Sequence, residues 1–216
     1  MDDQAVDPIK VGAFLAAYAQ HLQEPVKNTI LLDQISARSV SLSEPTYHSY
    51  LDKLKRLSII EEIPAWKPAI RSQTAIRRGR KRGFVDPSLA VALRKLSVDG
   101  LLKDFAFFER AFESLCLRDL RVYLGDRNGD IHHYRDDYGL SCDAIIKRRA
   151  GEYALIQTAL SSHRQESAAQ HLGRLEALVL QKKRPKPAFK MILTAGEYGY
   201  TRLDGIHIVP LACLRD

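Results

Sequence analysis

Residues 139–161, GLSCDAIIKRRAGEYALIQTALS, contain two apolar runs separated by a short basic turn. The runs SCDAII and YALIQTAL each have the length and the apolar content of a β-strand. The sequence RRAG between them has the composition of a turn. A further run lies within LRVYLGDRNGDIHHYRDDYG, where GDRNG and DDYG are also turn compositions. Together the three runs predict a three-stranded antiparallel meander.

Helical patterns flank this meander on both sides. Residues 100–124 precede it and are strongly apolar on one helical face, and residues 165–182 follow it as a long amphipathic helix. The sequence RPKPA ends that second helix, and two strand-like runs come after it, FKMILTAG and DGIHIVPLACL. The predicted element order is therefore αβββαβ with an added strand.

The N-terminal third of the chain has a different pattern. Residues 10–23 predict an amphipathic helix, and residues 29–37 a short apolar helix. A third helix starts at Ser43, which can cap it, with Pro45 in its first turn. The strand-like sequences SIIEEIPAW and KRGFVD follow, with a basic loop between them. This order predicts a winged helix-turn-helix, whose third helix commonly enters the major groove of DNA.

The two patterns divide the chain into two predicted domains. We expect a winged helix domain over residues 1–95 and an αβββαβ domain over residues 96–216. The fold class expected from this order is α+β.

The charge distribution favours an anionic partner. The formal net charge is +7, and RRGRKRG at residues 77–83 places five cations in seven residues. Clustered Lys and Arg attract phosphates and release counterions on contact, so DNA is the expected partner. A solvated basic loop is the alternative interpretation of this run, and a third helix that mixes Asp52 with Lys53 also fits protein contacts. The candidate nucleic-acid-binding residues are Thr46, Ser49, Lys53, Arg56, Arg77, Arg78, Arg80, Lys81 and Arg82.

The order αβββαβ is the core of the PD-(D/E)XK nucleases. In those enzymes a helix glutamate and carboxylates on the second and third strands hold Mg²⁺, and a lysine two residues beyond the last carboxylate helps to activate water. Residues i and i+2 of a strand point to one face, which explains the Glu-x-Lys spacing. Here the helix offers Glu113 and the second strand Asp143, but the third strand carries Gln157 and Ala159 in place of Glu and Lys.

From about residue 46 to the C-terminus the chain resembles a known family. The matching segments are TYHSYLDKLKRLSIIEEIPAW, KRGFVDPSLAVAL, FESLCLRDLRVY, HHYRDDYGLSCDAII, YALIQTALS, AAQHLGRLEAL and GYTRLDGIHIVPLACL. They are similar to the C-terminal region of bacterial and archaeal AAA-type ATPases, which carries a winged helix and a degenerate PD-(D/E)XK-like domain of unknown function. The resemblance implies acids at the positions of Ser141, Asp143 and Gln157, and a lysine at the position of Ala159. One of these four residues is retained.

The same resemblance implies an ATPase module ahead of the winged helix. The sequence contains no phosphate-binding loop of the form Gly-x-x-x-x-Gly-Lys-Ser/Thr. We therefore expect the chain to be the part of such a protein without its ATPase module.

The departures from the nuclease pattern predict that the chain does not cleave efficiently. The Gln157 amide supplies no charge to a hard divalent ion, and Ala159 supplies no functional group. Losing one positioned proton-transfer group costs about 10²- to 10⁴-fold in rate. Glu113 and Asp143 are left as a possible weak site for Mg²⁺ or Mn²⁺, or as carboxylates paired with arginine.

Three functions follow as hypotheses. The first is non-catalytic nucleic-acid binding through the basic wing and the third helix. The second is a module that docks on an ATPase subunit or on a second copy of the chain. The third is a weak metal-dependent nuclease in which Lys147, Arg148 or His163 replaces the missing lysine.

No membrane contact is expected. The sequence has no run of about 18 apolar residues, and its first ten residues, MDDQAVDPIK, lack the apolar stretch of a secretory signal. The expected location is the cytoplasm.

Overall fold

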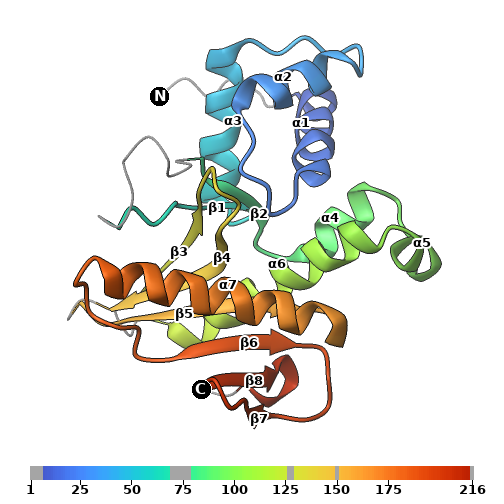
Figure 1. Cartoon of the computed structure of the whole chain (residues 1–216). Helices are drawn as coiled ribbons and strands as arrows, with labels where there is room; N and C mark the ends of the chain where they lie inside the picture. The colour runs from blue at the N-terminus through green and yellow to red at the C-terminus, as the bar shows by residue number, and fades with distance from the viewer. Residues whose placement is uncertain (1–6, 69–78, 126–128, 149–150, 215–216) are drawn as a thin grey trace. The chain divides into compact units, whose positions relative to one another are not determined.

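The computed structural model describes residues 7–68, 79–125, 129–148 and 151–214 (Figure 1). The chain packs as two units: the first comprises Met1–Glu62 and Gly79–Ser114, and the second Ile63–Arg78 and Leu115–Asp216. Helices dominate the first unit, and a six-stranded sheet the second. The predicted α+β class is therefore confirmed. This division follows packing alone, and the domains 1–95 and 96–216 stay a prediction.

Three helices open the first unit, and side chains cap the starts of the first and the third. These are α1 (Pro8–Gln20), α2 (Asn28–Ser36) and α3 (Glu44–Arg56). The Asp7 carboxylate accepts a hydrogen bond from the Ile9 backbone N–H at 2.9 Å at the start of α1. At α3, the Ser43 hydroxyl accepts one from the Thr46 N–H at 3.3 Å. Such caps satisfy donors that have no partner within the helix.

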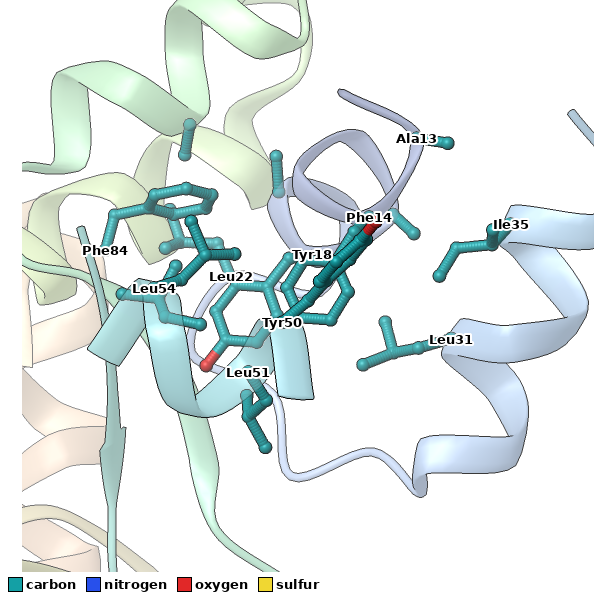
Figure 2. Close-up of a cluster of buried hydrophobic side chains, with 14 of the residues drawn as sticks. Ala13, Phe14, Tyr18, Leu22, Leu31, Ile35, Tyr50, Leu51, Leu54 and Phe84 are labelled. Carbon is teal, nitrogen blue, oxygen red and sulfur yellow. The ribbon is translucent and has the colours of Figure 1, made fainter. Parts of the chain in front are cut away.

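The core of the first unit lies between these helices. Figure 2 shows Phe14 and Tyr18 of α1 among the apolar side chains of α3, with Phe84 beside them. The rings of Phe14 and Tyr18 stack at 5.8 Å, and the ring of Phe84 meets Tyr18 edge-on at 5.5 Å. All three side chains are at most 1% exposed. Buried aromatic pairs of this kind contribute beyond their apolar area.

Two strands and three helices complete this part of the chain. They are β1 (Ile60–Ile63), β2 (Lys81–Phe84), α4 (Pro87–Leu93), α5 (Val98–Lys103) and α6 (Phe105–Leu124). The sequence predicts one helical segment over residues 100–124, but the structure divides it at Asp104. The Asp104 carboxylate accepts a hydrogen bond from the Phe107 N–H at 3.1 Å, so it caps α6 and separates it from α5.

The second unit is built on a mixed sheet. Its strands are β3 (Gly129–Arg135), β4 (Ser141–Arg148), β5 (Tyr153–Ala159), β6 (Lys190–Thr194), β7 (Tyr200–Thr201) and β8 (Ile206–Pro210). Their order in the sheet is β3-β4-β5-β6-β8-β7. β3, β4 and β5 pair antiparallel, as the meander predicts, whereas β6 runs parallel to β5 and to β8. Helix α7 (Ser162–Gln181) provides the crossover between β5 and β6, and a short 3₁₀ turn, Leu211–Cys213, follows β8.

Helices lie against both faces of this sheet (Figure 1). The inner stripe of α7, which includes Leu172 and Leu175, packs with Ile145 and Leu155 in one buried cluster. On the opposite face, the end of α6 lies beside Ile146. β5 is consequently buried along nearly its whole length, as expected for a central strand of such a sheet.

Within the described ranges, no helix combines the length and the apolar character needed to cross a bilayer.

Candidate functional site

The positions that would carry nuclease chemistry lie where β4 and β5 separate. The pairing of these two strands runs up to Ala144 opposite Ile156 and stops there. On its other side β4 carries a bulge, because Asp143 and Ala144 together oppose the single residue His133 of β3. A bulge bends its strand and redirects a side chain, and bulges are common beside active sites. Asp143 and Gln157 are thus brought together on adjacent strands, just beyond the last paired residues.

Asp143 forms hydrogen bonds to the neighbouring strand. Its Oδ2 atom accepts from the Thr158 backbone N–H and from the Thr158 hydroxyl, both at 3.0 Å. The first of these bonds replaces one that a continued ladder would supply to Thr158. The carboxylate therefore connects two diverging strands.

Gln157 connects the same two strands from β5. We call the point at which β4 and β5 diverge the fork. Its side-chain amide donates to the Ser141 carbonyl oxygen at 2.9 Å, and the residue is 5% exposed. Two residues further on, Ala159 is 2% exposed and belongs to the cluster beneath α7. The two residues expected at a Glu-x-Lys position are thus an amide hydrogen-bonded to β4 and a methyl group in the core.

His171 of α7 also contributes to the fork, although the sequence pattern does not predict it. Its Nδ1 atom accepts a hydrogen bond from the Ser141 N–H at 3.2 Å. Burial, together with the nearby Arg174, lowers the pKa of His171, although the Asp143 and Asp136 carboxylates oppose that shift. The segment AAQHLGRLEAL contains this histidine at a helical position, but spacing alone cannot show which strand the helix crosses.

Asp136 organises the turn that leads into β4. Its side chain is 1% exposed and accepts hydrogen bonds from the Tyr138 N–H and the Leu140 N–H, each at 3.0 Å. The Tyr134 hydroxyl donates to the same carboxylate at 3.1 Å. The sequence DDYG signals this turn, because Asp often accepts bonds from the backbone two residues ahead. Asp136 therefore has a positioning role for the start of β4.

Two family models match the chain and together cover most of it. Residues 108–214 match a domain of unknown function, DUF4143. Residues 2–100 match a second domain of unknown function, DUF8612. The search of curated proteins and the search of solved structures gave no match. The fork between β4 and β5 lies within the DUF4143 region.

Glu113, the predicted helix carboxylate, lies near the start of the DUF4143 region. It belongs to α6 in the first unit, and Lys81 of β2 donates a hydrogen bond to it. The two side chains are 12% and 9% exposed. Glu113 and Lys81 therefore form a nearly buried ion pair, while Asp143 and Gln157 belong to the second unit. No group of three or more His, Cys, Asp or Glu side chains able to hold a metal ion occurs among the described residues.

The candidate nucleic-acid residues of α3 lie at or near its surface. Ser49 and Arg56 are exposed, and Thr46 and Lys53 are half-buried. The Thr46 hydroxyl shares a 2.8 Å hydrogen bond with the Ser43 hydroxyl at the helix start. Helix α3 thus directs polar and cationic groups away from the apolar side that it contributes to the core.

The predicted wing cations fall into three groups. Arg80 is exposed, whereas Arg77 and Arg78 lie outside the described residues. Lys81 and Arg82 are 7% and 4% exposed, because all four residues of β2 are buried. Both side chains form ion pairs with glutamates of the first unit, so their charges stabilise that unit internally.

Arg82 is held by a network of oxygen acceptors. Its guanidinium donates to Glu62 at 3.1 Å, to the Val26 carbonyl at 3.0 Å and to the Asn28 side chain at 2.5 Å. Glu62 in turn accepts from Lys55 at 3.1 Å. The planar guanidinium suits several acceptors at once. The Arg82 side chain therefore links β2 to the loop before α2 and to β1.

Proposed function

We propose that this chain is a non-catalytic nucleic-acid-binding module from the C-terminal region of an AAA-type ATPase family protein. Residues 1–95 would form a winged helix-turn-helix, and residues 96–216 a degenerate PD-(D/E)XK-like domain. The sequence resemblance supports this assignment, as does the DUF4143 match, since that domain is commonly found in AAA-ATPase-associated proteins. The element order α1-α2-α3-β1-β2 is compatible with a winged helix.

The surface of α3 is the observation on which the binding proposal rests. Its apolar side forms the core of the first unit, while Ser49 and Arg56 are exposed and Lys53 is half-exposed. Arg80 adds an exposed cation next to β2. In winged helix proteins that bind duplex DNA, polar and cationic side chains of the third helix contact bases and phosphates, and a basic loop can contact further phosphates. The net charge of +7 supplies the long-range attraction.

The binding proposal is tested by the salt dependence of duplex binding. We expect the R77Q/R78Q/R80Q variant of the full chain to bind a labelled duplex more weakly, whatever its sequence. The slope of log K against log salt should flatten by about 0.9 for each DNA phosphate that the variant no longer neutralises. Lys81 and Arg82 are left intact, because their removal would change folding. Fluorescence anisotropy at several salt concentrations measures both quantities.

The K103Q variant is the matched control. It removes one exposed cation from α5, outside the proposed surface, and should leave the slope unchanged. Equal binding by all variants and the unmodified chain would overturn the proposal.

The non-catalytic part of the proposal has its own experiment. A labelled duplex is incubated with the purified chain in Mn²⁺ or Mg²⁺, beside D143A. We expect no cleavage in either reaction, because Gln157 and Ala159 occupy the Glu-x-Lys position and both are buried. Metal-dependent cleavage that disappears in D143A would show instead that the fork is a working nuclease site.

Protein docking is a second candidate, favoured by an apolar groove in the first unit. The groove is about 420 Å³ in volume and lies between α1 and the end of α3. Leu57 is 68% exposed beside it, and Lys53 and Arg56 also line it. Such a surface suits an acidic protein segment with apolar side chains. Sedimentation of the chain alone and with duplex DNA separates the two candidates, because a docking module self-associates or stays unbound by DNA.

A further inference from the structure

A small pocket opens in the second unit at the hairpin end of β4 and β5, the opposite end of their pairing from the fork. Its volume is about 210 Å³, below the roughly 300–1,000 Å³ of pockets for drug-sized ligands. Its walls are mainly aromatic rings, proline rings and aliphatic carbons. The principal lining residues are Trp66, Pro68, Lys147, Tyr153, Arg184 and Pro185, and we call this the Trp66 pocket.

The aromatic wall of the Trp66 pocket is held in place by its neighbours. The Trp66 ring lies 5.3 Å from the Tyr153 ring at an interplanar angle of 37°, and 6.2 Å from the Tyr134 ring. The Trp66 backbone N–H donates to the His133 carbonyl at 2.6 Å, which ties this segment to β3. An indole fixed from one side and open to a pocket on another is a ready surface for a flat ring.

Tyr153 is fixed in the same way. Its hydroxyl donates to the Pro185 carbonyl at 2.7 Å. Burial, with the Glu176 carboxylate, raises the pKa of Tyr153 to about 12, so the phenol keeps its proton at neutral pH. The pocket therefore has an uncharged aromatic floor that is hydrogen-bonded to its surroundings.

Cations border the pocket on two elements. Lys147 comes from the end of β4 and Arg184 from the loop after α7, and both side chains are exposed. Neither forms an ion pair with a carboxylate in the part of the chain that the structure describes. Lys182, Lys183 and Lys186 are further exposed cations of the loop after α7, and Lys67, next to Trp66, is also exposed.

The combination selects one class of ligand. Cations attract phosphates, while an apolar slot walled by aromatic rings receives a flat ring system. Nucleotides of a single strand present both groups together. Bases in a duplex are stacked inside it and cannot enter such a slot. An acidic peptide would satisfy the cations but would leave the aromatic slot without a matching ring.

We propose that the Trp66 pocket binds an unpaired base of single-stranded nucleic acid, with Lys147 and Arg184 contacting the adjoining phosphates. The site lies in the second unit and shares no residue with the α3 surface, so it goes beyond the proposed duplex binding and does not rest on it. Base stacking on an aromatic side chain tolerates different bases, and the site therefore has little sequence preference.

Trp66 itself reports on this site, because it is the chain's only tryptophan. The unmodified full chain is titrated with a deoxythymidine oligonucleotide while its tryptophan fluorescence is followed. We expect saturable quenching, and none with an abasic strand of the same length, which keeps the phosphates but has no bases. A duplex of that length should quench far less.

Variants separate stacking from charge. With a labelled oligonucleotide, W66A should weaken single-strand binding by about 5- to 150-fold, the equivalent of the ~1–3 kcal/mol of one stacked base. W66F should retain most of the affinity, because its ring can still stack and fill the core. The K147Q/R184Q variant should weaken binding and reduce its salt dependence, and K103Q should change neither.

Three outcomes would overturn the proposal. Quenching of equal size by the abasic strand would show that phosphates alone are bound. If polyglutamate quenches Trp66 as strongly as the oligonucleotide does, and displaces the oligonucleotide, the pocket binds acidic protein instead. Unchanged binding by W66A and K147Q/R184Q would place single-strand binding elsewhere. The R77Q/R78Q/R80Q variant distinguishes the two proposals, because it should lose duplex affinity and keep the Trp66 response.

Discussion

Asp143 is the one residue, among the four positions at which the resemblance implies an acid or a lysine, that matches the implied residue, and in the structure it has hydrogen-bonding partners of its own. It accepts two hydrogen bonds from Thr158, one from the backbone and one from the hydroxyl. Gln157 and His171 bond to Ser141 across the same fork. These residues stabilise the point at which β4 and β5 diverge.

We expect D143A to lower the free energy of unfolding by about 1–3 kcal/mol, because it leaves the partly buried Thr158 N–H without this acceptor. T158V keeps the shape and removes only the hydroxyl donor, so its effect should be smaller, about 0.5–1.5 kcal/mol. Urea unfolding of both variants measures the difference. A T158V effect equal to that of D143A would mean that the backbone bond contributes nothing.

The sequence identifies three residues of this fork as notable, but it does not predict the hydrogen bonds that they form. Asp143, Gln157 and Ala159 stand out by their places in two strand-like runs. The bulge at Asp143 could not be predicted, because one extra residue in β4 leaves no mark in the apolar pattern. His171 could not be predicted for a related reason, since the angle at which α7 crosses the sheet depends on packing.

At the scale of elements, β2 is predicted as a strand by KRGFVD and occurs there, but the burial of its two cations departs from what the sequence indicates. Lys81 and Arg82 are consecutive cations, and cations are almost never fully buried unless they are paired. The basic run RRGRKRG therefore predicts one exposed loop. Instead, both side chains have internal partners, Lys81 in Glu113 and Arg82 in Glu62. The sequence alone could not identify these partners, which are far away along the chain.

The Arg82 network predicts that replacing the Glu62 carboxylate by an uncharged amide strongly lowers the free energy of unfolding. E62Q removes the carboxylate beneath Arg82, whose side chain is 5% exposed, and should cost about 3–5 kcal/mol of stability. K55M removes the other partner of Glu62, but that side chain is 35% exposed, and the cost should stay below about 1 kcal/mol. Thermal or urea unfolding compares the two variants. Equal effects would mean that burial of the Arg82 pair is not what stabilises this sheet.

The regular elements agree more closely with the sequence prediction. The three-stranded meander, the long helix after it and the three N-terminal helices all appear in the structure, because apolar spacing records which side of an element is buried. Helix boundaries depend on caps, and the apolar pattern does not mark Asp104 as one. The result is a single predicted helix where the structure has α5 and α6.

At the scale of the whole molecule, two separate buried clusters underlie the two units. Trp66 packs against the second cluster, whereas Phe14 lies in the first. Tryptophan fluorescence therefore reports on the second unit, while far-ultraviolet circular dichroism reports on the helices of both. The two signals together can show whether one unit unfolds without the other.

We expect F14A to destabilise the first cluster by about 3–5 kcal/mol. Loss of helical signal should then begin at lower denaturant than the change in Trp66 fluorescence. L172A, in the second cluster, should shift the fluorescence transition instead. Coincident transitions in both variants would show that the two units unfold as one cooperative body.

The path of the chain also sets an order of events during synthesis. The segment Ile63–Arg78 belongs to the second unit, yet it is made before the chain returns to the first unit at Gly79. A ribosome adds about 5–20 residues per second, so this segment waits for seconds until its partner strand β3 exists. During that wait the nascent chain exposes Trp66 and Ala65, whose partners in the finished protein lie on β3 and β5. Closure of the first unit leaves these two residues uncovered, so the growing chain can associate with neighbouring chains on one messenger RNA until β3 and β5 have been made.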